Sequence, residues 1–92
     1  MNRKRSRLET IYTILTLSQQ GIRKTHIMYR ANLSHQQLVK YLKVLTTKKL
    51  LAEKDSLYFT TNQGTAFVDK FQEIQNIMDE NWQHPASRSN LT

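Results

Sequence analysis

Ser34 opens a short stretch whose side chains can exchange hydrogen bonds with the edges of nucleic-acid bases. The amide side chains in it can pair with adenine, and lysine can pair with guanine or with a phosphate, in a major groove about 12 Å wide. The predicted base contacts are Ser34, His35, Gln36, Gln37 and Lys40. A polar outer face is also typical of any third helix in a bundle, so this plainer interpretation stays open.

The sequence contains no comparable pattern of residues for catalysis. Ser34, His26 and the scattered carboxylates show no spacing of a nucleophile and a base, and the chain has no glycine-rich phosphate loop. Cysteine is absent, and the three histidines are too few and too dispersed for a metal site within one chain. A histidine and carboxylate site across a dimer stays open. The sequence predicts no enzyme activity, no cofactor, no metal and no small-molecule substrate.

The net charge of +7 is unevenly distributed along the chain. Residues 1–54 hold twelve Lys and Arg against Glu9 and Glu53, a net of +10, whereas residues 55–92 hold two basic and five acidic residues, a net of −3. A basic surface concentrates polyanions because neutralised phosphates release their condensed counterions. Nucleic acid is therefore the predicted partner. An anionic membrane and a merely solvated basic face are the alternatives.

Eight of the basic residues are suited to holding phosphates. Four lie in the N-terminal segment, as phosphate contacts or as an arm in the minor groove, with a basic tail that makes no defined contact as the alternative. Two precede the second predicted helix, where they would anchor the backbone. The predicted phosphate contacts are Arg3, Lys4, Arg5, Arg7, Arg23, Lys24, Lys43 and Lys54.

Apolar spacing predicts three helices in the first half of the chain. The first covers about residues 4–20 and stops at Gly21, and Thr25 can cap a short second helix. The inward-facing residues of the second helix are Ile27, Met28 and Ala31. A capping box of Ser34 and Gln37 opens the third helix, over about residues 35–48. Its buried stripe is Leu38, Leu42 and Leu45.

The pattern then changes to a period of two. Residues 51–54 and 57–60 alternate as the strands of a hairpin, joined by Asp55-Ser56. Three helices with a short turn between the second and third, followed by a hairpin, are typical of a winged helix-turn-helix domain.

Thr61 can cap a last helix that runs to about residue 83. Phe67, Phe71, Ile74 and Met78 step by four, three and four, which is a coiled-coil seam of under three heptads. A helix of about twenty residues reaches roughly 30 Å, further than so small a domain needs. We therefore predict that it projects into a dimer interface, with folding back onto its own domain as the alternative. The predicted dimerisation residues are Phe67, Phe71, Ile74, Ile77, Met78 and Trp82.

The central residues carry a resemblance to a known family. The run Gly21–Ser34, the Tyr41-Leu42 and Leu50-Leu51 pairs, and Tyr58, Thr61 and Gly64 are similar to the archaeal winged-helix family that includes the small 10a-type chromatin proteins of Sulfolobus. The resemblance covers about residues 6–80. It implies a DNA-binding protein whose last helix pairs with its counterpart in an antiparallel coiled coil.

Two positions depart from the family pattern. Lys49 replaces the glycine that ends the third helix, so we expect that helix to end differently. Thr60 replaces an apolar residue before the capping threonine, so the resemblance does not define how the hairpin docks.

The predicted fold class is therefore mainly α with a small β-hairpin. It divides into a winged helix-turn-helix domain over residues 1–61, a C-terminal dimerisation helix over 62–84 and a disordered tail over 85–92. We predict binding of double-stranded DNA by a homodimer, as a transcriptional regulator or a small chromatin protein. A protein–protein interaction module on the same fold is the alternative from another class. Stacking of single-stranded RNA on the tyrosines is a lesser one.

No apolar run reaches the roughly 18 residues needed to span a bilayer. The basic N-terminal segment also lacks the apolar stretch of a signal peptide. We expect a soluble cytoplasmic protein, associated with the nucleoid and not with membrane.

Overall fold

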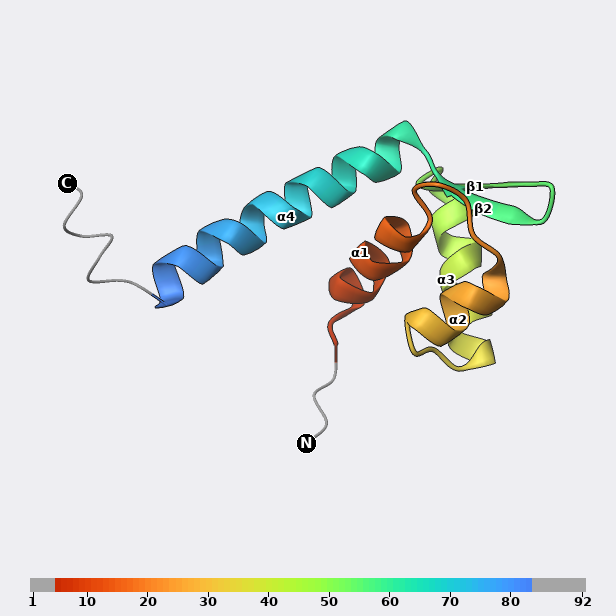
Figure 1. Cartoon of the computed structure of the whole chain (residues 1–92), viewed down its shortest axis with the longest axis horizontal. Helices are drawn as coiled ribbons and strands as arrows, with labels where there is room; N and C mark the ends of the chain where they lie inside the picture. The colour runs from red at the N-terminus through yellow and green to blue at the C-terminus, as the bar shows by residue number, and fades with distance from the viewer. Residues whose placement is uncertain (1–4, 84–92) are drawn as a thin grey trace.

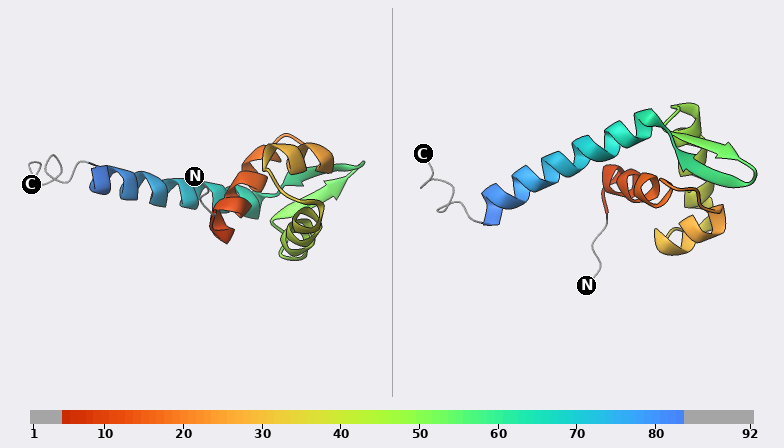
Figure 2. Two further views of the ribbon diagram at one scale, coloured as in Figure 1. Left: turned by 90° about the horizontal axis from the view of Figure 1, so that it is seen from below. Right: turned by 45° about the horizontal axis from the view of Figure 1, so that its top comes forward.

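The computed structural model describes residues 5–83, with side chains described as far as Asp79. These residues form α1 (Arg7–Leu17), α2 (Lys24–Arg30), α3 (His35–Thr47), β1 (Leu51–Lys54), β2 (Leu57–Thr60) and α4 (Asn62–Gln83) (Figure 1). The first three helices and the hairpin form a body, and α4 extends from it as an arm in every view (Figure 2). The Cα radius of gyration is 15.7 Å, against about 12 Å for a compact chain of this length.

One hydrophobic core is shared by α1, α2, α3, β1 and the start of α4. Its buried members are Ile14, Leu15, Ile27, Ala31, Leu38, Leu42, Leu45, Leu51 and Val68. All three leucines of the predicted stripe on α3 are among them, so the helical spacing in the sequence identified this face correctly. Val68 comes from α4, so the beginning of the arm belongs to the same core.

α1 is shorter than the predicted range of about 4–20. Ser6 and Glu9 form a capping box, in which Ser6 Oγ accepts from the Glu9 N–H at 3.0 Å and Glu9 Oε1 accepts from the Ser6 N–H at 2.9 Å. The helix therefore begins at Arg7. At the other end, Gly21 has φ +94°, and a Cβ there would lie 2.6 Å from the Phe59 ring. The predicted stop at Gly21 is wrong by a few residues, because α1 ends at Leu17 with Ser18 as its C-cap and Gly21 turns the chain afterwards.

The predicted cap of α2 at Thr25 is wrong. Arg23 occupies the N-cap position without a side-chain cap, and Thr25 lies inside the first turn. The reason is tertiary: Ile22 exchanges two backbone hydrogen bonds with Tyr58 of β2, at 3.1 and 2.8 Å, which holds the chain extended up to the helix. The inward-facing residues agree with the prediction, since Ile27 and Ala31 are buried and Met28 is half-buried.

α3 ends without the glycine that the family pattern would supply. Lys49 takes the left-handed conformation itself, with φ +64°. The N–H of Lys49 donates to the Thr46 carbonyl at 3.0 Å and that of Leu50 to the Leu45 carbonyl at 2.9 Å, which together form a Schellman motif. The helix therefore stops where a glycine would stop it, at the cost of a strained lysine backbone.

The hairpin has the predicted tight connection. Leu51 pairs with Thr60 and Lys54 with Leu57 in an antiparallel register. Asp55 and Ser56 form the turn with φ +54° and +67°. Positive φ at both positions is the signature of a type I′ turn, whose twist matches that of the strands.

Thr60 docks the hairpin through hydrogen bonds instead of apolar contact. Its N–H donates to the Ser18 carbonyl at 3.0 Å, and its hydroxyl donates to the Leu15 carbonyl. Polar contacts to the end of α1 therefore hold the hairpin at this position. Thr61 caps α4 as predicted, since its Oγ1 accepts from the Gly64 N–H at 3.1 Å.

Among the described residues, no helix is long and apolar enough to cross a lipid bilayer. The predicted disordered tail over 85–92 lies outside the described residues. The division of the chain at residue 61 stays a prediction.

Candidate nucleic-acid interface

The turn between α2 and α3 is built from local hydrogen bonds and one buried helix face. Asn32 has φ +57°, and the Leu33 N–H donates to the Met28 carbonyl at 2.9 Å, so α2 also ends in a Schellman motif. Ile27 and Leu38 are almost completely buried on the two sides of the turn. This packing fixes α3 relative to α2 and leaves the opposite face of α3 in solvent.

The exposed face of α3 is polar and cationic. At 100° per residue, the positions opposite its leucine stripe are Gln36, Lys40, Lys43 and Thr47, and all four are exposed. No Asp or Glu occurs anywhere in α3. Of the predicted base contacts, Gln36 and Lys40 therefore lie at the centre of this face, and His35 is exposed at the beginning of the helix.

Ser34 and Gln37 have a structural role as well. Ser34 Oγ accepts from the Gln37 N–H at 3.1 Å, and Gln37 Oε1 accepts from the Ser34 N–H at 3.0 Å. Pairing of Gln37 with adenine would need the same Oε1 oxygen. Base contact by Gln37 therefore requires the capping box to open, which Gln36 does not require.

The predicted phosphate contacts fall into separate groups. Lys24 and Lys43 line one groove beside α3, and Arg7 lines another. The Arg5 guanidinium donates to the Ala31 carbonyl at the end of α2, where a cation is favoured by the helix dipole. Arg23 is exposed next to Lys24. Arg3 and Lys4 lie outside the described residues.

Lys54, a predicted phosphate contact, lies at the tip of the hairpin between two acidic residues. Lys54 is exposed, but Glu53 precedes it and Asp55 follows it, so the tip has a net charge of −1. A contact of Lys54 with phosphate would thus be opposed by a neighbouring carboxylate. The cationic residues of the body are concentrated on the helices.

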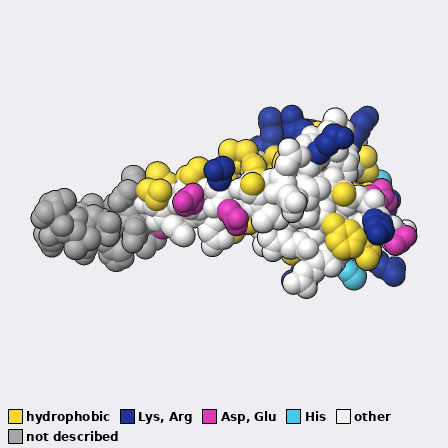
Figure 3. Space-filling model, turned by 90° about the horizontal axis from the view of Figure 1, so that it is seen from above, with side chains coloured by type: hydrophobic (Ala, Val, Ile, Leu, Met, Phe, Trp, Pro, Cys, Tyr) yellow, Lys and Arg dark blue, Asp and Glu magenta, His cyan; other side chains and the backbone are white. Residues whose placement is uncertain are grey.

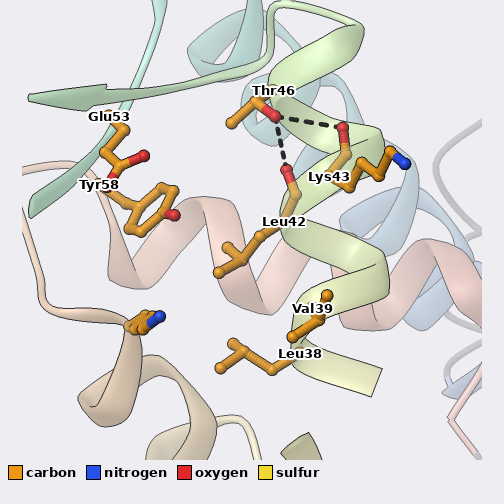
Figure 4. A pocket seen from close by; sticks show the side chains of 8 residues that line it. Leu38, Val39, Leu42, Lys43, Thr46, Glu53 and Tyr58 are labelled. Atoms are coloured by element: carbon orange, nitrogen blue, oxygen red, sulfur yellow. Dashed lines mark hydrogen bonds between the residues drawn. The ribbon is translucent and has the colours of Figure 1, made fainter. Parts of the chain in front are cut away.

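A groove separates α3 from the hairpin (Figure 4). Tyr58 and Glu53, which pair across the two strands, face α3 over this groove. Burial, and then the negative charge and hydrogen bond of Glu53, raise the pKa of the Tyr58 hydroxyl. The tyrosine is therefore a neutral hydrogen-bonding group beside α3. Tyr58 also packs against the hydrophobic core.

Several exposed residues near this surface were not predicted from the sequence. Thr47 lies on the outer face of α3, and Lys48 caps the helix. A helical projection of residues 35–48 would have identified both. Arg30 and Tyr29, which is 75% exposed, end α2, and no periodic signal in the sequence distinguishes them from ordinary surface residues.

The arm presents a different kind of surface. In Figure 3, Lys and Arg side chains lie mainly on the body, whereas hydrophobic side chains follow one edge of the arm. Ile74, Ile77 and Met78 are 59%, 52% and 57% exposed. These three predicted dimerisation residues therefore have no covering partner among the described residues.

The first half of the arm packs on its own chain. Phe71 stacks on Tyr12 with ring centroids 4.7 Å apart, and Phe67 lies 6.1 Å from Phe71 and contacts the core. Tyr12 also donates to Gln72 Oε1 at 3.3 Å. The alternative of folding back thus holds for this half, while the second half extends beyond the body (Figure 1). The side chain of Trp82 lies outside the described part.

Comparison with known proteins assigns this architecture to a family. A family model described as winged helix-turn-helix matches residues 4–79, most of the chain. The chain belongs to the winged helix-turn-helix family. The solved structure of Sso10a-2, a DNA-binding protein from Sulfolobus solfataricus, shares the winged helix-turn-helix fold with a TM-score of 0.75 at 21% identity, over 96% of this chain and 97% of that one. The resemblance expected from residues 21–64 is confirmed.

Two proteins of Methanocaldococcus jannaschii are similar in sequence. The uncharacterised protein MJ0287 is 31% identical over 77 residues, which are 83% of this chain and 79% of that protein. The uncharacterised protein MJ0290 is 29% identical over 72 residues, 77% of this chain, and the chain spans about a third (34%) of its length.

Proposed function

We propose that this winged helix-turn-helix protein binds double-stranded DNA, with the outer face of α3 in the major groove. The observation that carries the proposal is the face of Gln36, Lys40, Lys43 and Thr47, which is exposed on a helix without any acidic residue. A helix of this kind meets phosphates and base edges without electrostatic opposition. A protein-binding face would instead be apolar or acidic at its centre.

The number of side chains that can read bases is small. Gln36, Lys40 and His35 are available without rearrangement, whereas Ser34 and Gln37 are engaged in the capping box. The hairpin adds Lys54, with carboxylates on both sides. We therefore propose weak sequence preference, with most of the affinity from phosphate contacts. This favours a chromatin role over that of a regulator with one operator, and would place the protein on the nucleoid.

We further propose a homodimer that is held by the second half of α4. Ile74, Ile77 and Met78 are more than half exposed on one arm, and burial of such side chains contributes about 1.5–3 kcal/mol each. Pairing with the same residues of a second copy would cover them. Two bodies would then present two α3 faces, able to connect two DNA segments or to bend one.

The experiment is a fluorescence anisotropy titration of the full chain against a random-sequence DNA duplex and the matching single-stranded RNA, over a range of salt. We expect micromolar or tighter duplex binding that weakens steeply with salt, because each phosphate contact adds about 0.9 to the logarithmic slope. Lys40→Ala should lower that slope by about one. Lys70→Ala removes the same charge from an exposed position on the arm and should leave it unchanged. Absence of duplex binding at low salt would overturn the proposal.

A further inference from the structure

A second groove lies on the other side of α3, between that helix and α1. Its volume is about 310 Å³. Arg7, Lys40 and Lys48 line it, and no acidic side chain does. Its interior is apolar and includes Ile11, Val44 and Leu50. The groove therefore combines a cationic rim with a hydrophobic interior, a composition that the groove beside the hairpin lacks, since Glu53 lines that one.

We infer that this groove binds a small hydrophobic carboxylate, such as an aromatic monocarboxylate. The apolar interior would take the hydrocarbon part of the molecule out of water. The carboxylate would lie at the rim, where Arg7 and the two lysines can donate charge-assisted hydrogen bonds to it. Small-molecule pockets range over about 300–1,000 Å³, so a molecule with one ring system or a short branched chain fits by size.

Other occupants match the groove less well. Two turns of a second copy's helix need roughly 800 Å³ at a diameter of about 10 Å, well above the volume available. A phosphate group alone would satisfy the cations but would leave the apolar interior in contact with water. Val44, which is 38% exposed, would then gain nothing from the ligand. Only a molecule that is both anionic and hydrophobic would contact the cationic rim and also cover the apolar interior.

Occupancy of the groove should oppose DNA binding, a consequence that rests on the proposed function. Lys40 belongs both to this rim and to the outer face of α3. A bound carboxylate would neutralise Lys40 and Arg7, two cations that are proposed to contact DNA. Since linkage is reciprocal, DNA would weaken carboxylate binding by the same factor, which we expect to be about fivefold or more.

The test uses 1-naphthoate as the probe and the uncharged 1-naphthalenemethanol as its matched control. The full chain, labelled with ¹⁵N and free of DNA, is titrated with each while amide shifts are recorded. We expect saturable shifts centred on Val44 and Leu50, with the alcohol at least about tenfold weaker because it lacks the charge. Equal binding of the two compounds, or no saturable shift, would overturn the site.

Two valines of α3 provide matched variants. Val44→Glu places a carboxylate in the groove and should weaken naphthoate by at least about tenfold through like-charge repulsion. Val39→Glu makes the same change in the groove beside the hairpin and should stay within about twofold. Lys48→Ala offers a milder test should Val44→Glu fail to fold. Equal losses in both valine variants would contradict the assignment.

The naphthoate titration tests this inference separately from the proposed function. Failure of the chain to bind duplex would remove the DNA proposal but leave the naphthoate result standing, because that measurement contains no DNA. Conversely, naphthoate that binds but leaves duplex affinity unchanged would overturn the coupling alone.

Discussion

α3 and the second half of α4 are both helices with one face in solvent, yet the two faces have opposite chemistry. α3 buries its leucines and exposes Gln36, Lys40 and Lys43. α4 exposes Ile74, Ile77 and Met78. A polar face that is already solvated gains most from a charged partner, whereas an apolar face gains from any surface that covers it. The chain thus exposes two helix faces of different chemistry, which are the two binding surfaces proposed above.

The largest effect should come from the arm. Ile74→Glu together with Met78→Glu would place two charges in each half of a dimer interface, and we expect roughly 3 kcal/mol or more of lost association, over a hundredfold. Light scattering should report the mass of one chain. Gln75→Glu adds one charge to another exposed position of the same helix and serves as the control. A dimer that survives the double change would place the interface elsewhere.

Phe71 provides a second test of the arm, because it lies in the first half of α4, which packs on its own chain. Because its ring stacks on Tyr12 of the same chain, Phe71→Glu should lower the thermal stability of the body as well as any self-association. The arm variants should lower association alone. Thermal unfolding by circular dichroism distinguishes the two, and equal melting temperatures would argue that Phe71 contributes little to its own domain.

Charge reversal on α3 should have the next largest effect. Lys40→Glu together with Lys43→Glu removes two phosphate contacts and adds two repulsions, for which we expect roughly a thirtyfold to hundredfold loss of duplex affinity at moderate salt. The oligomeric mass should not change. Lys70→Glu on the arm should cost no more than about threefold. Comparable losses from Lys70→Glu would show that net charge, and not the α3 face, determines binding.

Removal of a helix cap should have a smaller effect, on the free energy of unfolding. Ser34→Ala removes the acceptor for the Gln37 N–H, with an expected loss of about 1 kcal/mol of unfolding free energy. Thr25→Ala should cost much less, since Thr25 is not the cap of α2. Urea denaturation measures both. Duplex affinity of the folded Ser34→Ala protein also tests whether the freed Gln37 gains a contact with DNA.

The smallest expected effect is a gain in stability from a substitution in the hairpin turn. Ser56 adopts φ +67° in the turn of the hairpin, and glycine adopts positive φ without steric cost, so Ser56→Gly should stabilise the protein by about 0.5–1 kcal/mol. Ala52→Gly, at an exposed position inside β1, is the control and should destabilise by a similar amount. A loss of stability in Ser56→Gly would contradict the type I′ assignment.

Much of the helix-turn-helix region could be predicted from local patterns. The capping box of Ser34 and Gln37, the leucine stripe of α3 and the tight hairpin all depend on residues that are close together in sequence. Such signals are strong because each is one hydrogen bond or one helical period. The start of α2 was missed because it depends on Ile22 pairing with Tyr58, a contact between distant segments.

The candidate interface shows the same division. Periodicity correctly separated the exposed side chains of α3 from the buried ones, but it did not show that Gln37 is held by Ser34 or that Arg5 reaches the end of α2. The groove of Arg7, Lys40 and Lys48 joins residues of two helices. No spacing within one helix predicts it.

By itself, the amino-acid sequence determined the order of the elements, the uneven charge and which face of each helix is apolar, because these follow from composition and from the helical period. Only the tertiary structure decided how α4 is used: Val68 joins the core and Phe71 stacks on Tyr12, while Ile74 and Met78 are left in solvent. All four positions carry the same apolar signal in sequence. The difference arises because α1 is only long enough to cover the first half of α4, and that is a property of packing.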